Sequence, residues 1–210
     1  MILHGYWRSG AAYRVRIALA LKGVAYDQAN HDLRTGAQTA PGYAALNPAR
    51  LVPALEVDGI VIPQSVAILE WIDERFPDPP LMPADANGRA IVRAMIATIA
   101  ADVHPLHNLR TLNALRDTFG ADDAQVNGWT RRWMGDGFAA LEALIARHGA
   151  GFAYGDTPTL ADCITAPALY SAARFGVDTA PFPALVAAGE RIAARAGDAH
   201  PDCQPDADAA

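Results

Sequence analysis

The chain begins with a short apolar stretch, a polar break and then a long, mainly apolar stretch. Residues 2–6 favour a buried strand, and residues 7–10 interrupt it. Apolar side chains surround most of the following stretch up to Gly23, a residue typical of the left-handed end of a helix. The pattern predicts a helix whose first turn directs free backbone N–H groups and a positive dipole end toward Ser9. Such a helix start suits an anion or a thiolate.

Strand and helix signals continue through the first half. Two pairs of apolar residues, Leu55 and Val57 and then Ile60 and Ile62, flank Asp58-Gly59. This dipeptide is the one most typical of a two-residue hairpin turn. Ser65 is predicted to be the N-cap of a helix whose apolar stripe reaches Phe76. The other elements expected here are a strand at 24–30 and a short helix around 43–46.

Four prolines within residues 77–85 end this half, and the rest of the chain has helical patterns only. We therefore predict two domains, residues 1–79 and 86–210, joined by a stiff linker at 77–85. Strands followed by helices indicate the α+β class. Helices are expected at 87–114 with an interruption near Pro105, at 122–148, at 159–175 and at 181–196, with residues 197–210 loosely ordered.

Composition narrows the function classes. The 210 residues carry a net charge of −6, so the surface has no general attraction for nucleic acid or an anionic membrane. No run of 18 apolar residues and no secretory signal is present, which predicts a cytoplasmic protein without a membrane span. Cys163 and Cys203 give neither a disulfide framework nor metal spacing, and we expect no metal site.

Motifs along nearly the whole chain resemble the zeta class of glutathione transferases, which includes maleylacetoacetate and maleylpyruvate isomerases. They are YWRSGAAYRVRIALALKG, ALNPARLVPAL, PQSVAILEWI, HPLHNLR, GDTPTLADC and HPDCQPD. The resemblance implies a thioredoxin-like N-terminal domain with a mixed four-stranded sheet, an all-helical second domain, glutathione as cofactor and a homodimer. One departure is Ser9-Gly10-Ala11, where the class usually has Ser-Ser-Cys. The Ser-Gly form, together with Arg110, is more similar to maleylpyruvate isomerases.

The resemblance assigns glutathione contacts to the first half. Ser9 would donate a hydrogen bond to the thiolate, although a serine at this position could act only as a helix cap. The N–H groups of Gly10 and Ala11 would share this task. The remaining contacts implied are Gln38 with the glycyl end, Val52 with the cysteinyl unit through a cis bond to Pro53, and Gln64 and Ser65 with the γ-glutamyl end.

Arginines would hold the substrate. Arg8, Arg110 and Arg174 match active-site positions of the resembling isomerases, and guanidinium groups suit a dicarboxylate because each can bind a carboxylate bidentately. Isolated arginines are more often solvated surface groups. His104 and Asn108, one helical turn apart, could face the same cleft and bind the cofactor there, and His104 could equally be structural. Asp102 resembles a residue that reaches glutathione on the partner subunit.

These residues lead to one preferred function and two alternatives. The resemblance implies glutathione-dependent cis–trans isomerisation of a maleyl diacid in aromatic catabolism, with maleylpyruvate favoured over maleylacetoacetate. A second hypothesis is a glutathione transferase that conjugates or dehalogenates α-halo acids. A third is a non-catalytic binding protein, against which Ser9, Gln64 and Ser65 argue. A thioredoxin-type oxidoreductase is excluded because residues 7–14 contain no cysteine.

Overall fold

The computed structural model describes residues 1–205, whose contacts group them into two compact units. Unit 1 comprises residues 1–81 and the C-terminal segment from Ala193, and unit 2 comprises residues 82–192. The change of unit falls inside the predicted linker, but the C-terminal segment groups with the first half. The division into domains 1–79 and 86–210 stays a prediction, because compact units do not establish domains that fold independently.

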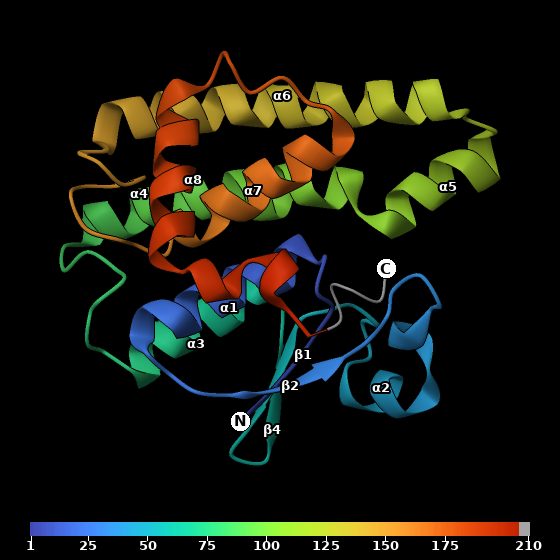
Figure 1. The fold of residues 1–210 in the computed structure, drawn as a ribbon, viewed down its shortest axis with the longest axis horizontal. Coiled ribbons are helices and arrows are strands. Elements are labelled where there is room, and N and C mark those ends of the chain that lie inside the picture. Colours follow the sequence, from blue (N-terminus) through green and yellow to red (C-terminus); the bar gives the residue numbers. More distant parts are fainter. Residues whose placement is uncertain (206–210) are drawn as a thin grey trace. The chain divides into compact units, whose positions relative to one another are not determined.

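Unit 1 is built on a four-stranded sheet with the order β2-β1-β3-β4 (Figure 1). β1 pairs in parallel with β2 and antiparallel with β3, and β3 pairs antiparallel with β4. The mixed sheet expected from the sequence is confirmed, and so is the hairpin at Asp58-Gly59, since it joins β3 to β4. The strands are β1 (Ile2–Gly5), β2 (Asp27–Asn30), β3 (Ala54–Val57) and β4 (Ile60–Pro63).

Two helices pack together beside this sheet, and a smaller helix lies in the connection from β2 to β3 (Figure 1). Leu3 and Leu55 of the sheet and Ile17, Ile68 and Ile72 of the helices are at most 1% exposed. The core therefore forms between strand side chains and the apolar faces of the two helices. On α3 this face differs from the predicted stripe, because Ile68 is buried and Phe76 is only half-buried. The helical elements are α1 (Gly10–Lys22), η1 (Ala37–Thr39), α2 (Pro41–Leu46) and α3 (Ser65–Arg75).

The C-terminal segment packs onto unit 1 through Arg16, which is almost fully buried. Its Nε donates to the carbonyl of Ala199 at 2.9 Å, and its Nη2 donates to the carbonyl of Trp7 at 3.1 Å. Two short 3₁₀ helices, η4 (Gly197–Ala199) and η5 (Pro201–Cys203), lie here. The expectation of loose order is therefore wrong for residues 197–205, and residues 206–210 lie outside the described part.

Unit 2 is helical, as predicted. The expected interruption near Pro105 is present: α4 passes into a π-helix, η2, and then a 3₁₀ turn, η3, before α5 begins. Aspartates cap two of these helices: Asp85 accepts from Gly88 N, and Asp122 forms a capping box with Gln125. The elements are α4 (Ala86–Ala97), η2 (Thr98–Val103), η3 (His104–His107), α5 (Leu109–Phe119), α6 (Asp123–His148), α7 (Asp162–Phe175) and α8 (Pro183–Arg195).

The start of α7 depends on a buried carboxylate. Asp162 accepts hydrogen bonds from Ala153 N at 2.7 Å, Thr159 N at 2.7 Å and Thr159 Oγ1 at 3.0 Å. Burial raises the pKa of Asp162 to about 6, although these hydrogen bonds act in the opposite direction. The group is thus ionised at neutral pH and holds the preceding loop against the helix. No helix among residues 1–205 is long and apolar enough to cross a membrane.

Candidate functional site

One end of the unit 1 sheet gathers several chain segments. The strand register pairs His4 with Ala54, and Ala54 with Pro63. The chain therefore leaves β1 and β4, and enters β3, at this same end. The segments concerned carry three groups of predicted residues: Arg8 to Ala11, Val52-Pro53 and Gln64-Ser65. β2 runs parallel to β1, so the loop that carries Gln38 also leaves from this end.

Ser9 occupies the N-cap of α1. Its backbone is extended (φ −70°, ψ 114°), and its Oγ accepts a hydrogen bond from Ala12 N at 3.2 Å. The capping role is therefore real. An accepting hydroxyl still has its own hydrogen, so Ser9 can donate to a second group. The N–H groups of Gly10 and Ala11 lie in the first turn, where helical N–H groups have no intrahelical partner. Together they provide donors and a positive dipole end for an anion.

Ser65 does not have the capping role that its position in the sequence suggested. α3 begins at Ser65 itself, and the N-cap is Gln64, whose side chain makes no capping hydrogen bond. The prediction of Ser65 as N-cap is wrong because its backbone is already helical and its Oγ accepts from Arg14 Nη1 at 3.1 Å. Gln64 has a positive φ of 70° and an exposed side chain. Both residues still stand at a helix start suited to a carboxylate.

The segment before β3 presents backbone groups. The Val52-Pro53 peptide bond is cis, as the resemblance implies. Just before it, the carbonyl of Leu51 accepts from Tyr43 Oη at 2.6 Å and from Asn47 Nδ2 at 2.7 Å. These side chains of the α2 region fix the backbone on which the predicted contact of Val52 depends.

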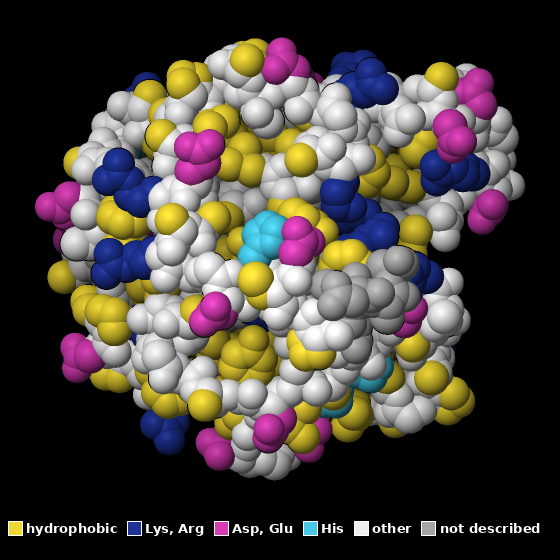
Figure 2. All heavy atoms as spheres, viewed as in Figure 1, with side chains coloured by type: hydrophobic (Ala, Val, Ile, Leu, Met, Phe, Trp, Pro, Cys, Tyr) yellow, Lys and Arg dark blue, Asp and Glu magenta, His cyan; other side chains and the backbone are white. Residues whose placement is uncertain are grey.

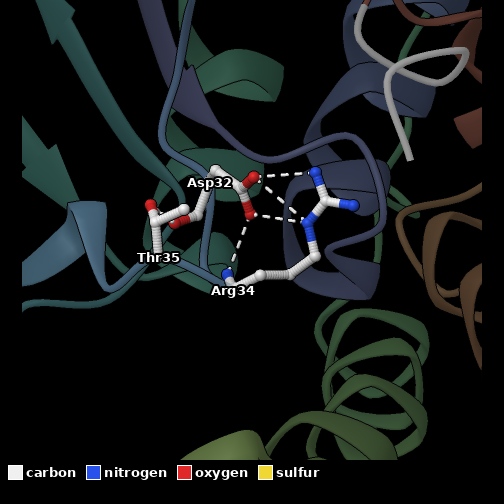
Figure 3. A network of polar contacts seen from close by, with 3 residues as sticks. All are labelled: Asp32, Arg34 and Thr35. Atoms are coloured by element: carbon white, nitrogen blue, oxygen red, sulfur yellow. Dashed lines mark hydrogen bonds and ion pairs between the residues drawn. The ribbon is translucent and has the colours of Figure 1, made fainter.

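Asp32 closes a turn with Arg34 and Thr35 (Figure 3), and this turn precedes Gln38 in the chain. The Asp32 carboxylate accepts from Arg34 N at 2.8 Å, and also from Nε and Nη2 of the Arg34 guanidinium. Its carbonyl accepts from Thr35 Oγ1 at 2.9 Å and from Ala37 N at 3.1 Å. Hydrogen bonds from Arg34 lower the pKa of Asp32. The loop before Gln38 therefore has a defined shape although none of residues 31–37 is fully buried.

Five side chains in this region have buried polar atoms with no partner among the described residues. They are Tyr6 Oη, Trp7 Nε1, Arg8 Nε, Arg14 Nε and Gln38 Oε1. Buried polar groups normally have hydrogen-bond partners, so such a concentration is unusual. A charged peptide with amide, amine and carboxylate groups could satisfy donors and acceptors of this kind. The residues present therefore fit the glutathione that the resemblance implies.

In unit 2 the predicted residues lie around the interrupted helix. Asp102 is exposed on the π-helix η2, and His104 is half-buried at the start of η3. A Cβ placed on Gly137 of α6 would collide with the side chain of Val103. The glycine therefore permits the close approach of α6 to η2. Side chains also anchor η3, because Trp129 Nε1 donates to the carbonyl of Leu106 at 2.7 Å.

His104 and Asn108 are not one turn apart on a common helix, and that expectation is wrong. Asn108 has an extended backbone and caps α5, its side chain accepting from Arg110 N at 3.2 Å. The 3₁₀ turn at Pro105 separates the two residues, because proline supplies no N–H and tertiary contacts favour a break there. The His104 ring instead lies 5.1 Å from that of His107.

The two arginines of unit 2 stand at helix ends. Arg110 is exposed in the first turn of α5, and Arg174 is exposed in the last turn of α7. The guanidinium of Arg174 lies 5.6 Å from the ring of Phe175, and Phe175 in turn contacts His107. Contacts thus link the end of α7 to η3. The assignment of these arginines to a substrate stays a prediction.

Charges on the face shown in Figure 2 are mixed, with acidic and basic side chains interspersed. An anionic ligand would thus depend on local arginines and helix ends. Within residues 1–205 no group of three His, Cys, Asp or Glu side chains could hold a metal ion.

Arg14 is the residue at this site that sequence reasoning missed. It lies in α1, is 3% exposed and contacts Ser65. A signal was present: a charged residue in a helix predicted to be covered on more than one side must find a buried partner. The identity of that partner, 51 positions away, depends on the tertiary fold.

Comparison with known proteins places the chain in a family. The N-terminal domain of glutathione S-transferase matches residues 8–75, and the C-terminal domain matches residues 101–196. Together with the fold and the site at the end of the sheet, these matches establish that the chain belongs to the glutathione S-transferase family.

Its relatives narrow the class further. Maleylpyruvate isomerase of Ralstonia sp. is 47% identical to this chain, and the alignment covers 98% of this chain and 99% of the relative. The holo structure of a maleylpyruvate isomerase, described as a bacterial glutathione S-transferase of the zeta class, has a TM-score of 0.95 at 45% identity, covering 98% of this chain and 99% of the other. Maleylacetoacetate isomerase from Methylobacterium extorquens AM1, solved with bound malonate and glutathione, has a TM-score of 0.94 at 35% identity, covering 99% of each chain.

Proposed function

We propose that this chain is a glutathione-dependent isomerase that converts the cis double bond of a maleyl diacid to trans, with maleylpyruvate ahead of maleylacetoacetate. The observation that carries the proposal is the full-length similarity to an enzyme named maleylpyruvate isomerase. The donor-rich start of α1 supports it. These relatives do not favour the alternative of a transferase acting on α-halo acids.

The proposed chemistry divides between cofactor and protein. Glutathione supplies a thiolate that can add to, and leave, a double bond conjugated to a carbonyl group. Ser9 donates its hydroxyl hydrogen toward the sulfur, while the first-turn N–H groups of Gly10 and Ala11 favour negative charge there. This side of the reaction needs no protein thiol, so Ala11 at the usual cysteine position is compatible with activity.

The remaining residues hold the two anions. Gln38, Val52, Pro53, Gln64 and Ser65 are proposed to bind the glutathione backbone and its terminal carboxylates. The proposed diacid ligands are Arg8, Arg110 and Arg174, whose guanidinium groups stabilise carboxylates and the negative charge that develops on the carbonyl oxygen during reaction. His104 and Asn108, like Asp102, are proposed to contribute to glutathione binding.

Two further proposals concern the oligomeric state and the location of the enzyme. We propose that it forms a two-fold dimer in which Asp102 reaches the glutathione bound by the partner subunit. We also propose that the enzyme is located in the cytoplasm. A cytosolic location agrees with the use of reduced glutathione as cofactor.

An absorbance assay tests the function. Purified protein is mixed with maleylpyruvate or maleylacetoacetate, with and without glutathione, and loss of the cis substrate is followed. We expect turnover only with glutathione and faster turnover of maleylpyruvate. Turnover that is independent of glutathione, or no turnover of either diacid, would contradict the proposal.

A further inference from the structure

A buried arginine stands behind the start of α3. Arg14 is 3% exposed, Ser65 is 6% exposed, and Arg14 Nη1 donates to Ser65 Oγ at 3.1 Å. Arg14 Nε is also buried and has no partner among residues 1–205. We propose that Arg14 is a positioning residue for glutathione, which aligns the Ser65 hydroxyl and adds a buried positive charge where the γ-glutamyl carboxylate binds. This inference rests on the proposed glutathione site.

The hydrogen bond determines which way Ser65 can donate. A hydroxyl has one hydrogen and two acceptor lone pairs, whereas a guanidinium can only donate. Ser65 Oγ must therefore accept from Arg14, and its single hydrogen is available for another acceptor. Ser65 is also the first residue of α3, so its backbone N–H has no intrahelical partner. Hydroxyl and backbone thus present donors together, and an ionised carboxylate is a group that only accepts.

The charge of Arg14 adds a second argument. Among the described residues no carboxylate forms an ion pair with it, and its only described side-chain partner is the neutral Ser65. Burial lowers the pKa of Arg14 to about 10, so the group stays charged at neutral pH. A buried charge is costly unless an anion compensates it. A carboxylate at the start of α3 would supply that compensation, in surroundings where electrostatic attraction is strong.

A purely structural reading is the natural competitor. Arg14 could serve only to tie α1 to α3, in which case its removal would disturb the whole site equally. The two readings differ in one respect: positioning for a carboxylate matters only to a ligand that has that carboxylate. A glutathione analogue with γ-aminobutyrate in place of γ-glutamate lacks this group and keeps the rest of the peptide.

The experiment measures binding by titration calorimetry for glutathione and for this analogue. The variants are Arg14→Met, Arg14→Lys, Ser65→Ala and the double variant Arg14→Met/Ser65→Ala. We expect Arg14→Met to weaken glutathione binding about tenfold and to leave analogue binding nearly unchanged. Arg14→Lys should recover part of the loss, because it keeps the charge without the planar fork. Arg75→Met is the matched control, since it removes an exposed arginine at the far end of α3.

Coupling between the two residues gives an independent readout. If Arg14 acts through Ser65, the double variant should bind glutathione more tightly than the summed effects of the single changes predict. Equal loss of both ligands, or strictly additive effects, would overturn the inference. If Arg14→Met does not fold, Arg14→Lys must still weaken glutathione more than the analogue. A wild-type protein that does not bind glutathione would overturn the proposed function as well.

Discussion

The Ser9 oxygen has two hydrogen-bonding capacities that a thiolate site can use together. It accepts from Ala12 N, which stabilises the first turn of α1, and it keeps a hydrogen to donate. The same residue can therefore cap the helix and contact an anion. A thiol near this helix start has its pKa lowered both by the donors and by the dipole.

Replacing Ser9 tests this double role. We expect Ser9→Ala to raise the pKa of bound glutathione by about 1–2 units, because a hydrogen bond to a charged group contributes roughly 1.5–3 kcal/mol. The reaction at neutral pH should slow while the rate at high pH recovers. Ultraviolet titration of the thiolate in the complex measures the shift. An unchanged pKa would assign the activation to the backbone N–H groups of Gly10 and Ala11.

Substrate affinity should depend on single arginines, because the protein carries a net charge of −6. Arg110→Ala or Arg174→Ala is expected to lower diacid turnover by about ten- to a hundredfold, the loss of one charged hydrogen-bonded pair. Lysine at either position should restore only part of it. Steady-state kinetics with varied diacid and varied glutathione separates the effects. If glutathione affinity fell in parallel, these arginines would not be ligands specific to the diacid.

At the scale of elements, local signals were sufficient where short-range chemistry decides the structure. Asp58-Gly59 predicted the β3–β4 hairpin, and the Asp122 region predicted the start of α6. Two predictions failed where a distant residue intervenes. Ser65 lost its capping role to an interaction with Arg14, and the C-terminal segment gained order from Arg16. Such partners are separated by 51 and 183 positions, so no local pattern reveals them.

The start of α7 offers a test at this scale. Asp162→Ala leaves the N–H groups of Ala153 and Thr159 without their acceptor inside unit 2. Unsatisfied buried donors are expensive, and we expect the free energy of unfolding to fall by about 2–5 kcal/mol. Urea unfolding followed by circular dichroism measures the change. Asp156→Ala, at an exposed neighbouring position, is the control and should have little effect. Equal stability of the two variants would refute the structural role of Asp162.

For the whole molecule, the sequence predicted the α+β class and the mixed sheet correctly, because hydrophobic periodicity and turn signals are strong in both halves. The candidate site could be predicted only in part from the residue pattern itself. A helix start beside Ser9 followed from the pattern, but the contributions of Val52, Gln64 and the arginines came from the resemblance. The strand register is needed to show that the unit 1 residues among them lie at one end of the sheet.

Assembly provides the prediction for the whole molecule. If Asp102 serves the glutathione of a partner subunit, the active species must be a two-fold dimer. Sedimentation velocity at the concentration of the activity assay should then give the mass of two chains. Asp102→Ala should weaken glutathione binding while the dimer persists. A monomer with full activity would contradict this assignment.

The most direct test of glutathione-dependent isomerisation counts both glutathione and product in one reaction. Proton magnetic resonance distinguishes the cis and trans vinyl protons of the diacid and also quantifies free glutathione. With glutathione present at a small fraction of the diacid, we predict conversion of maleylpyruvate to the trans isomer over many turnovers, with the free glutathione undiminished at the end. Consumption of one glutathione per diacid, or no trans product, would contradict the account and point to a conjugating transferase instead.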